Sequence, residues 1–223
     1  MDLPLSLFPA AWHRLALALL LPVLVWLART TPWRRLLLPS QSHLMLGFAV
    51  VLSLLWSLKA GVKPGLNLHL LGAMAAVLAL GPQLAMITLA LALVGITLNG
   101  ALEWQSWPLN FVLMAAVPVF VASALQRLVE RRLPTHFFVF VFVVAFFGAG
   151  VTVMLQGLLA SLAMVAAGAY SIDFLTSDYL PYFLLLGFSE AWLSGAIITI
   201  FVVYRPDWVA AFDDRRYLAS PNR

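Results

Sequence analysis

The 223-residue sequence contains no cysteine and few charged residues. Without cysteine the chain forms neither a disulfide nor a thiolate metal site. Charged residues make up 10% of the sequence and hydrophobic residues 63%, with a mean hydropathy of +0.99. A soluble domain carries roughly 25% charged residues and about half apolar ones. So few charges cannot cover the surface of a water-soluble fold, and we expect lipid to surround most of the chain.

Several motifs that carry chemistry are also missing from the sequence. It has no G-x-x-x-x-G-K-[ST] loop for nucleotide phosphates, no H-E-x-x-H zinc motif and no G-x-S-x-G nucleophile turn. We therefore do not expect an enzyme. The net charge of +4 does not indicate a nucleic-acid partner either, because the basic residues lie at the ends of apolar runs, where membrane proteins keep them.

The apolar runs predict one all-α membrane domain over residues 1–223, built from about seven membrane-spanning helices. A span needs about 20 apolar residues to cross a core of about 30 Å. The third and fourth segments are shorter and are divided by Gly81-Pro82, so we expect two short helices buried inside the bundle. The predicted segments are 12–28, 43–58, 66–80, 84–99, 109–129, 136–168 and 180–204.

The distribution of lysine and arginine predicts the orientation. With the N-terminus outside and the C-terminus inside, ten of the thirteen basic residues fall on the inner side. The positive-inside rule favours this arrangement, and an odd number of spans agrees with it. The ten inner residues are Arg29, Arg34, Arg35, Arg127, Arg131, Arg132, Arg205, Arg215, Arg216 and Arg223; the outer ones are Arg14, Lys59 and Lys63.

Polar side chains at membrane depth are costly, so each is a candidate for function. Asn67 and His69 begin the third segment, Asn110 begins the fifth, and Glu190 lies within the seventh. Asn67, Asn110 and Glu190 are candidates to line a substrate pocket. Two structural alternatives stay open: each asparagine caps a helix, and Glu190 hydrogen-bonds a neighbouring helix.

A family pattern surrounds His69. The stretch from Gly65 to Ala73, followed by Leu80-Gly81-Pro82, resembles the CbiM/NikM family, the substrate-capture subunits of energy-coupling-factor importers for cobalt and nickel. The resemblance extends to Asn110 and to the end of the chain. The matching residues around His69 are Gly72, Ala76, Leu80, Gly81, Pro82 and Ala85, and those near the end are Gly187-Phe188-Ser189-Glu190 and Tyr204-Arg205-Pro206-Asp207.

The resemblance implies a metal site at the N-terminus. In that family the ion is captured by the N-terminal amine, by the amide and imidazole of a histidine at position two, and by a distant histidine. These roles carry over to Met1, to residue two and to His69, with the segment 1–11 folded into the outer mouth of the bundle. Residue two is Asp2 rather than histidine, so a carboxylate would replace an imidazole. Oxygen is a harder donor than nitrogen and is less suited to Ni(II) or Co(II).

The resemblance also implies partners and a location. The chain would be a multi-pass subunit in the inner (cytoplasmic) membrane of a bacterium. It would hold no tightly bound cofactor and would carry Co(II) or Ni(II) as cargo. A transmembrane scaffold subunit and cytoplasmic ATPase subunits would complete the importer. Two alternatives remain open: the same fold captures another solute, or the chain is a membrane assembly protein without transport activity.

Overall fold

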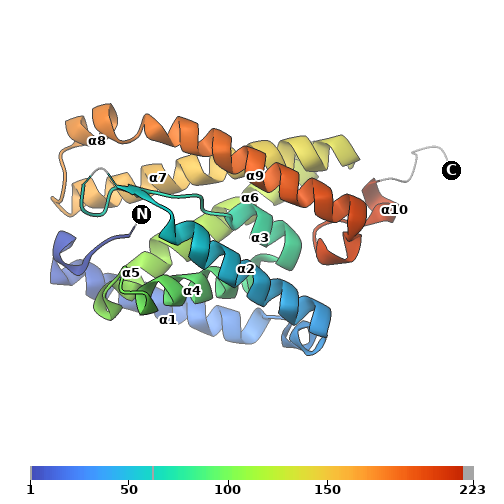
Figure 1. Ribbon diagram of the computed structural model, residues 1–223, viewed down its shortest axis with the longest axis horizontal. Helices are drawn as coiled ribbons and strands as arrows, with labels where there is room; N and C mark the ends of the chain where they lie inside the picture. The colour runs from blue at the N-terminus through green and yellow to red at the C-terminus, as the bar shows by residue number, and fades with distance from the viewer. Residues whose placement is uncertain (1, 62, 218–223) are drawn as a thin grey trace.

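The computed structural model describes residues 2–61 and 63–217, which form an elongated helical bundle (Figure 1). The helices run mostly along its long axis, with α8 at one end and α10 at the other. The α-helices are α1 (Ala10–Thr30), α2 (Pro39–Ser57), α3 (Ala73–Leu80), α4 (Pro82–Leu98), α5 (Trp107–Phe111), α6 (Val117–Arg132), α7 (Gly148–Ala166), α8 (Ile172–Asp178), α9 (Tyr182–Tyr204) and α10 (Asp214–Tyr217). The other elements are the 3₁₀ turns η1 (Leu5–Leu7), η2 (Trp33–Leu37), η3 (Trp104–Ser106) and η6 (Pro206–Trp208), the π-helical segments η4 (Val112–Ala116) and η5 (Val139–Phe147), and the strands β1 (Ala60–Gly61) and β2 (Asn67–Leu68).

Among the described residues, five helical stretches are long and apolar enough to cross a membrane: α1, α2, Trp104–Arg132, Val139–Ala166 and α9. They overlap the predicted segments 12–28, 43–58, 109–129, 136–168 and 180–204, so the prediction of an all-α membrane bundle is confirmed. The outer faces of these helices carry exposed large apolar side chains, such as Leu21 of α1 and Leu185 of α9. Such faces are stable against lipid and not against water.

The count of seven spanning helices is not confirmed, and the predicted helix over 66–80 is wrong in its first half. Residues 67–68 form β2, a loop follows, and α3 begins only at Ala73. With eight residues, α3 rises about 12 Å and cannot cross a core of about 30 Å. All eight of its residues are buried, which agrees with a short interior helix. The helix α4 starts at Pro82, directly after Gly81, and has 17 residues.

Hydrogen bonds bring several element ends together at the end of the bundle that includes α10. Arg35 donates from Nη1 to the carbonyl oxygen of Leu80 (3.1 Å) and from Nη2 to Gln41 Oε1 (2.7 Å). Gln41 Nε2 donates to the carbonyl oxygen of Asp207 (3.3 Å), and the amide of Ala210 donates to the carbonyl oxygen of Ala79 (3.0 Å). These bonds satisfy the carbonyl groups at the end of α3 and place η2, α3 and η6 side by side.

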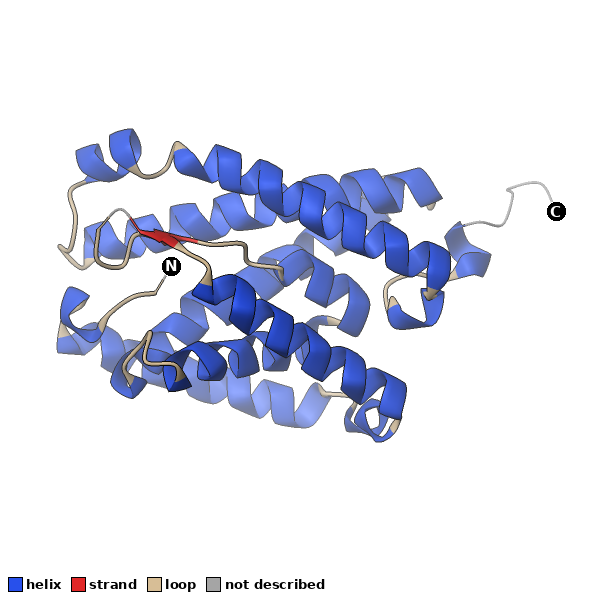
Figure 2. Ribbon diagram, in the orientation of Figure 1, coloured by secondary structure: helices blue, strands red, loops and turns tan. Residues whose placement is uncertain are grey.

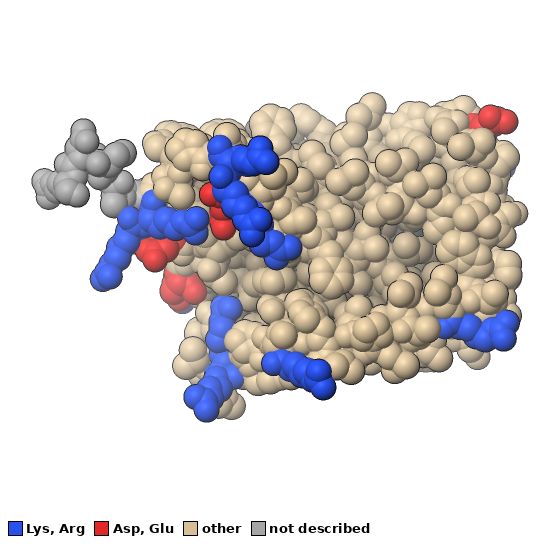
Figure 3. All heavy atoms as spheres, turned by 180° about the vertical axis from the view of Figure 1, so that it is seen from behind, with Lys and Arg blue, Asp and Glu red and all other residues tan. Residues whose placement is uncertain are grey.

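Basic residues gather at this same end, as Figure 3 shows on one face of the molecule near the grey tail. Arg216 Nη1 lies 3.9 Å from Glu130 Oε2, which brings the end of α6 to α10. Between the two ends the surface in that view is almost free of charge. The inner residue Arg223 lies outside the described residues. The positive-inside rule favours the cytoplasm for this end, and the orientation stays a prediction.

Reporter fusions test the orientation. A reporter joined after Arg132 or after Arg216 should report the cytoplasm, because both positions follow clusters of arginine. A reporter inserted at Gly100, in the turn after α4, should report the outside. Activity and fluorescence of paired periplasmic and cytoplasmic reporters are the measurements. A periplasmic signal at either arginine position would reverse the orientation.

Candidate metal centre

A short hairpin lies in the half of the bundle away from α10 (Figure 2), and His69 directly follows its second strand, β2. Strands β1 and β2 pair antiparallel, with Ala60 opposite Leu68 and Gly61 opposite Asn67. The same register, extended by one residue, sets Lys59 opposite His69. The missing side chain of Gly61 makes room for its neighbour, because a Cβ built there would lie 2.5 Å from Asn67 Oδ1.

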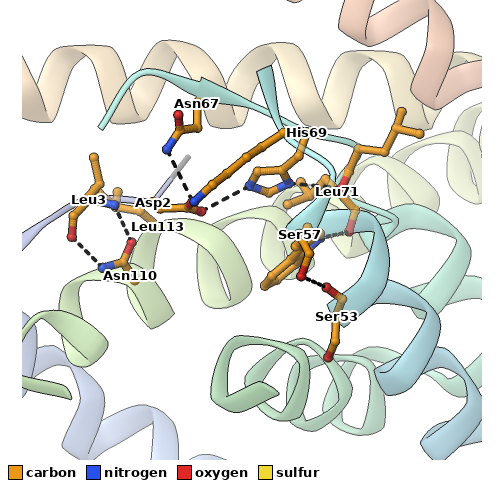
Figure 4. Close-up of polar contacts among 12 residues, drawn as sticks. Asp2, Leu3, Ser53, Ser57, Asn67, His69, Leu71, Asn110 and Leu113 are labelled. Atoms are coloured by element: carbon orange, nitrogen blue, oxygen red, sulfur yellow. Dashed lines mark hydrogen bonds and ion pairs between the residues drawn. The ribbon is translucent and has the colours of Figure 1, made fainter. Parts of the chain in front are cut away.

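The N-terminal segment enters the bundle beside this hairpin and is held by Asn110 of α5 (Figure 4). Asn110 Oδ1 accepts the amide of Leu3, and Asn110 Nδ2 donates to the carbonyl oxygen of Leu3, both at 2.9 Å. The same Nδ2 lies 3.0 Å from the carbonyl oxygen of Ser106. The paired bonds fix the backbone of residue 3, and they leave Asp2 only 3% exposed.

The Asp2 carboxylate lies between three side chains of the hairpin. Its Oδ2 accepts bonds from Lys59 Nζ and from Asn67 Nδ2, the latter at 3.3 Å. Its Oδ1 is buried without a hydrogen-bond partner among the described residues. That oxygen lies 3.9 Å from His69 Nε2, beyond direct hydrogen bonding. Figure 4 shows the carboxylate and the imidazole facing each other.

The imidazole of His69 presents Nε2 to this carboxylate. Its Nδ1 lies 3.1 Å from the carbonyl oxygen of Leu70. A carbonyl only accepts, so Nδ1 carries the proton and Nε2 carries the lone pair of the neutral ring. Burial lowers the pKa of His69 to about 3, although the Asp2 carboxylate opposes this shift. The ring is therefore neutral at pH 7, which is the state that binds a metal.

Glu190 of α9 holds the loop that follows His69. Its Oε2 accepts the amide of Leu71 at 2.8 Å, and its Oε1 accepts the amide of Gly72 at 2.6 Å. Gly72 is the N-cap of α3 with φ of 70°, a left-handed conformation that favours glycine. A carboxylate at a helix N-terminus also interacts favourably with the helix dipole. Trp56 Nε1 donates to the carbonyl oxygen of Leu71 (3.3 Å), so both sides of this peptide segment are fixed.

The structure brings some of the predicted site residues together and separates others. Asp2, Asn67 and His69 meet at one point, and Met1 lies outside the described residues. Asn110 and Glu190 bind backbone groups on either side of that point. The helix-cap alternative is wrong for both asparagines, because Asn67 belongs to β2 and Asn110 binds Leu3 from within α5. For Glu190, the alternative was a hydrogen bond to a neighbouring helix; the structure shows bonds to the loop residue Leu71 and to Gly72, the N-cap of α3.

Sequence reasoning missed Lys59 and Tyr179. Lys59 was counted only as a topogenic charge, although the hairpin register would have placed it opposite His69. Tyr179 is buried, and its hydroxyl has no hydrogen-bond partner among the described residues. Burial raises the pKa of Tyr179, and the Asp2 carboxylate adds to the shift, so its hydroxyl lies within the electrostatic reach of this cluster. No signal in the sequence pointed to Tyr179.

The two facing donors are spaced to share one cation. Metal–nitrogen and metal–oxygen bonds to histidine and carboxylate are about 2.0–2.2 Å long. Asp2 Oδ1 and His69 Nε2, 3.9 Å apart, can therefore both reach an ion between them. Within residues 2–61 and 63–217 no group of three or more His, Cys, Asp or Glu side chains converges. Further ligands would have to come from backbone groups, from other side chains or from water.

The clamp from Glu190 generates a stability prediction. Glu190→Gln should lower the free energy of unfolding by about 1–3 kcal/mol, because one amide of the 71–72 segment would face an NH₂ group instead of an acceptor. Glu190→Leu should cost more. Thermal unfolding in detergent is the measurement. Glu103→Gln is the matched control: Glu103 is exposed and accepts one amide, that of Leu5, which a glutamine oxygen can still accept. Equal losses at both positions would contradict the clamp.

Comparisons with known proteins agree with this architecture. Two solved structures, described as a transition metal transporter and a truncated transition metal transporter, superpose with TM-scores of 0.78 and 0.77. Each is 20% identical in sequence and covers 91% of this chain, which corresponds to 93% and 98% of the solved chains. At that identity they show a shared fold. A search of curated proteins finds no match. A family model described as the cobalt uptake substrate-specific transmembrane region matches residues 2–208, and the chain therefore belongs to the CbiM family.

Proposed function

We propose that this chain captures a divalent transition-metal ion, Co(II) or Ni(II), at the outer end of the bundle for import across the membrane. The observation that carries the proposal is the approach of Asp2 Oδ1 to His69 Nε2 at 3.9 Å. These residues are far apart in sequence, both are buried, and the oxygen has no hydrogen-bond partner in the described part of the chain. A cation there would give the Asp2 oxygen a partner and could also bind His69 Nε2.

The surroundings of the two donors support a site for capture. The His69 ring stacks at a tilt on Trp56, with centroids 5.4 Å apart, and its Nδ1 bond to Leu70 fixes the tautomer. Such outer bonds orient metal-binding imidazoles in known sites. A cavity of about 10 Å³ beside the ring is lined by His69, Asn67 and Gln156 together with four apolar residues. That space suffices for about one water molecule.

The proposal includes an assembly. A metal captured in a bundle of this kind crosses the membrane only when the bundle moves, and the described chain has no phosphate-binding loop to supply energy. We propose that a transmembrane scaffold subunit and cytoplasmic ATPase subunits, as in energy-coupling-factor importers, drive the transfer in the inner membrane of a bacterium. Family membership supports this arrangement. Capture of another solute, and an assembly role without transport, are the competing functions.

Metal titration of the full-length protein tests the proposal. The chain is purified in detergent with a C-terminal tag and with the formyl group removed, so that Met1 keeps a free amine. We expect Ni(II) or Co(II) to bind with one-to-one stoichiometry by calorimetry. His69→Ala should weaken binding by more than the roughly 10–100-fold that loss of a ligand's outer partner costs. Asp2→His should tighten it, because these ions prefer nitrogen to carboxylate oxygen.

His43→Ala is the matched control for the histidine substitution. His43 lies on α2 in an apolar groove between α2 and α9, away from Asp2, and its replacement should leave the affinity unchanged. If wild type, His43→Ala and Asp2→His all fail to bind either ion, the metal cargo is refuted. Unchanged binding in His69→Ala would move the site elsewhere in the chain.

A further inference from the structure

The proposed metal site already holds a positive charge. Lys59 Nζ donates to Asp2 Oδ2, the partner oxygen of the one that faces His69. The lysine side chain is 29% exposed, whereas the side chains of Asp2 and His69 are 3% and 2% exposed. The ammonium therefore reaches from the rim of the bundle into a buried cluster.

The position of Lys59 follows from the hairpin. Lys59 comes directly after α2 and directly before β1, and the pairing of Ala60 with Leu68 sets it opposite His69. Its four-carbon side chain extends from that backbone position to the carboxylate, and Asn67 donates to the same oxygen. A buried carboxylate without a counter-charge is strongly disfavoured, and this lysine supplies one.

A lysine ammonium and a metal ion cannot share this carboxylate without repelling each other. A divalent ion on Asp2 Oδ1 repels the ammonium on Oδ2 twice as strongly as a monovalent ion would, and the buried position of Asp2 weakens the screening by water. Because Lys59 is on the rim, its side chain can rotate into water at little cost, whereas Asp2 is fixed by the bonds of Leu3 to Asn110.

We propose that Lys59 is a tethered cation that neutralises Asp2 in the empty site and that an incoming metal ion must displace. This inference rests on the proposed function. Lys59 then determines specificity: an ion that binds only the carboxylate, such as Mg²⁺, gains too little to displace the ammonium. An ion that also bonds to the His69 nitrogen, as Co(II) and Ni(II) prefer, gains enough.

Lysine-to-methionine substitutions test the inference, with Lys63 as the matched control. Lys59 directly precedes the hairpin and Lys63 lies in its turn. Both substitutions remove one positive charge, but Lys63 Nζ lies 3.9 Å over the ring of Phe174 instead of on Asp2. Lys59→Met should lower the Kd for Ni(II) by about tenfold or more, equivalent to about 1.4 kcal/mol. It should also raise the affinity for Mg²⁺ to a measurable level. Lys63→Met should change neither.

Amine labelling of the wild-type protein gives a readout that needs no substitution. Addition of Ni(II) should increase the reactivity of Lys59 towards an amine-acylating reagent, measured by peptide mass spectrometry, because the displaced ammonium enters water. The reactivity of Lys63 should stay constant and serves as the internal reference.

The outcomes separate this inference from the proposed function. Tighter binding in Lys59→Met alone, with Ni(II)-dependent labelling of Lys59, supports the displacement. If wild type binds Ni(II) but Lys59→Met binds equally or more weakly, or if labelling of Lys59 does not respond to Ni(II), the displacement is refuted and the metal site stands. If wild type, Asp2→His and both lysine variants bind no metal, both proposals are refuted.

Discussion

The bond between Glu190 and the start of α3 is the constraint on which the rest of this end of the bundle depends. A carboxylate within a membrane needs donors, and the first amides of a buried helix need acceptors. The two bonds to Leu71 and Gly72 satisfy both requirements at once. They also fix the direction in which the chain enters α3. His69 is three residues before Gly72, so the carboxylate on α9 determines where the imidazole can lie.

The residues that face the proposed ion and the residues that fix the surrounding backbone come from different parts of the chain. The residues that face the proposed ion come from the N-terminal segment and the hairpin, which have little regular structure. The residues that fix these segments, Asn110 and Glu190, come from helices and bind main-chain atoms. Extended backbone at membrane depth is tolerated where protein buries it, and Leu66 and Leu71 are both almost fully buried. The positions of Asp2 and His69 are thus set by helices whose own side chains do not face the proposed ion.

The sequence predicted the class of fold because the length of an apolar run is a local property, and it is visible in each of the five long spans. It failed over residues 66–72, where an apolar run resembles a helix but is extended: the pairing with 60–61 and the acceptor on Glu190 override local preference. The family pattern pointed to Asp2 and His69. Lys59 and Tyr179 were missed because their roles arise only from segments that meet in space. The helix-cap alternative was wrong for both asparagines because their partners are also distant in sequence: Asn67 donates to Asp2, and Asn110 binds the main chain of Leu3. The roles of the cluster in binding remain the subject of the experiments above.

The anchoring of Leu3 by Asn110 imposes an order on biogenesis. The two residues are 107 positions apart, so Asn110 leaves the ribosome long after the first helix has entered the membrane. Until α5 is inserted, the N-terminal segment lacks the partner for its main chain, and Asp2 lacks a fixed position. The segment synthesised first can therefore take its final place only after α5 has been made.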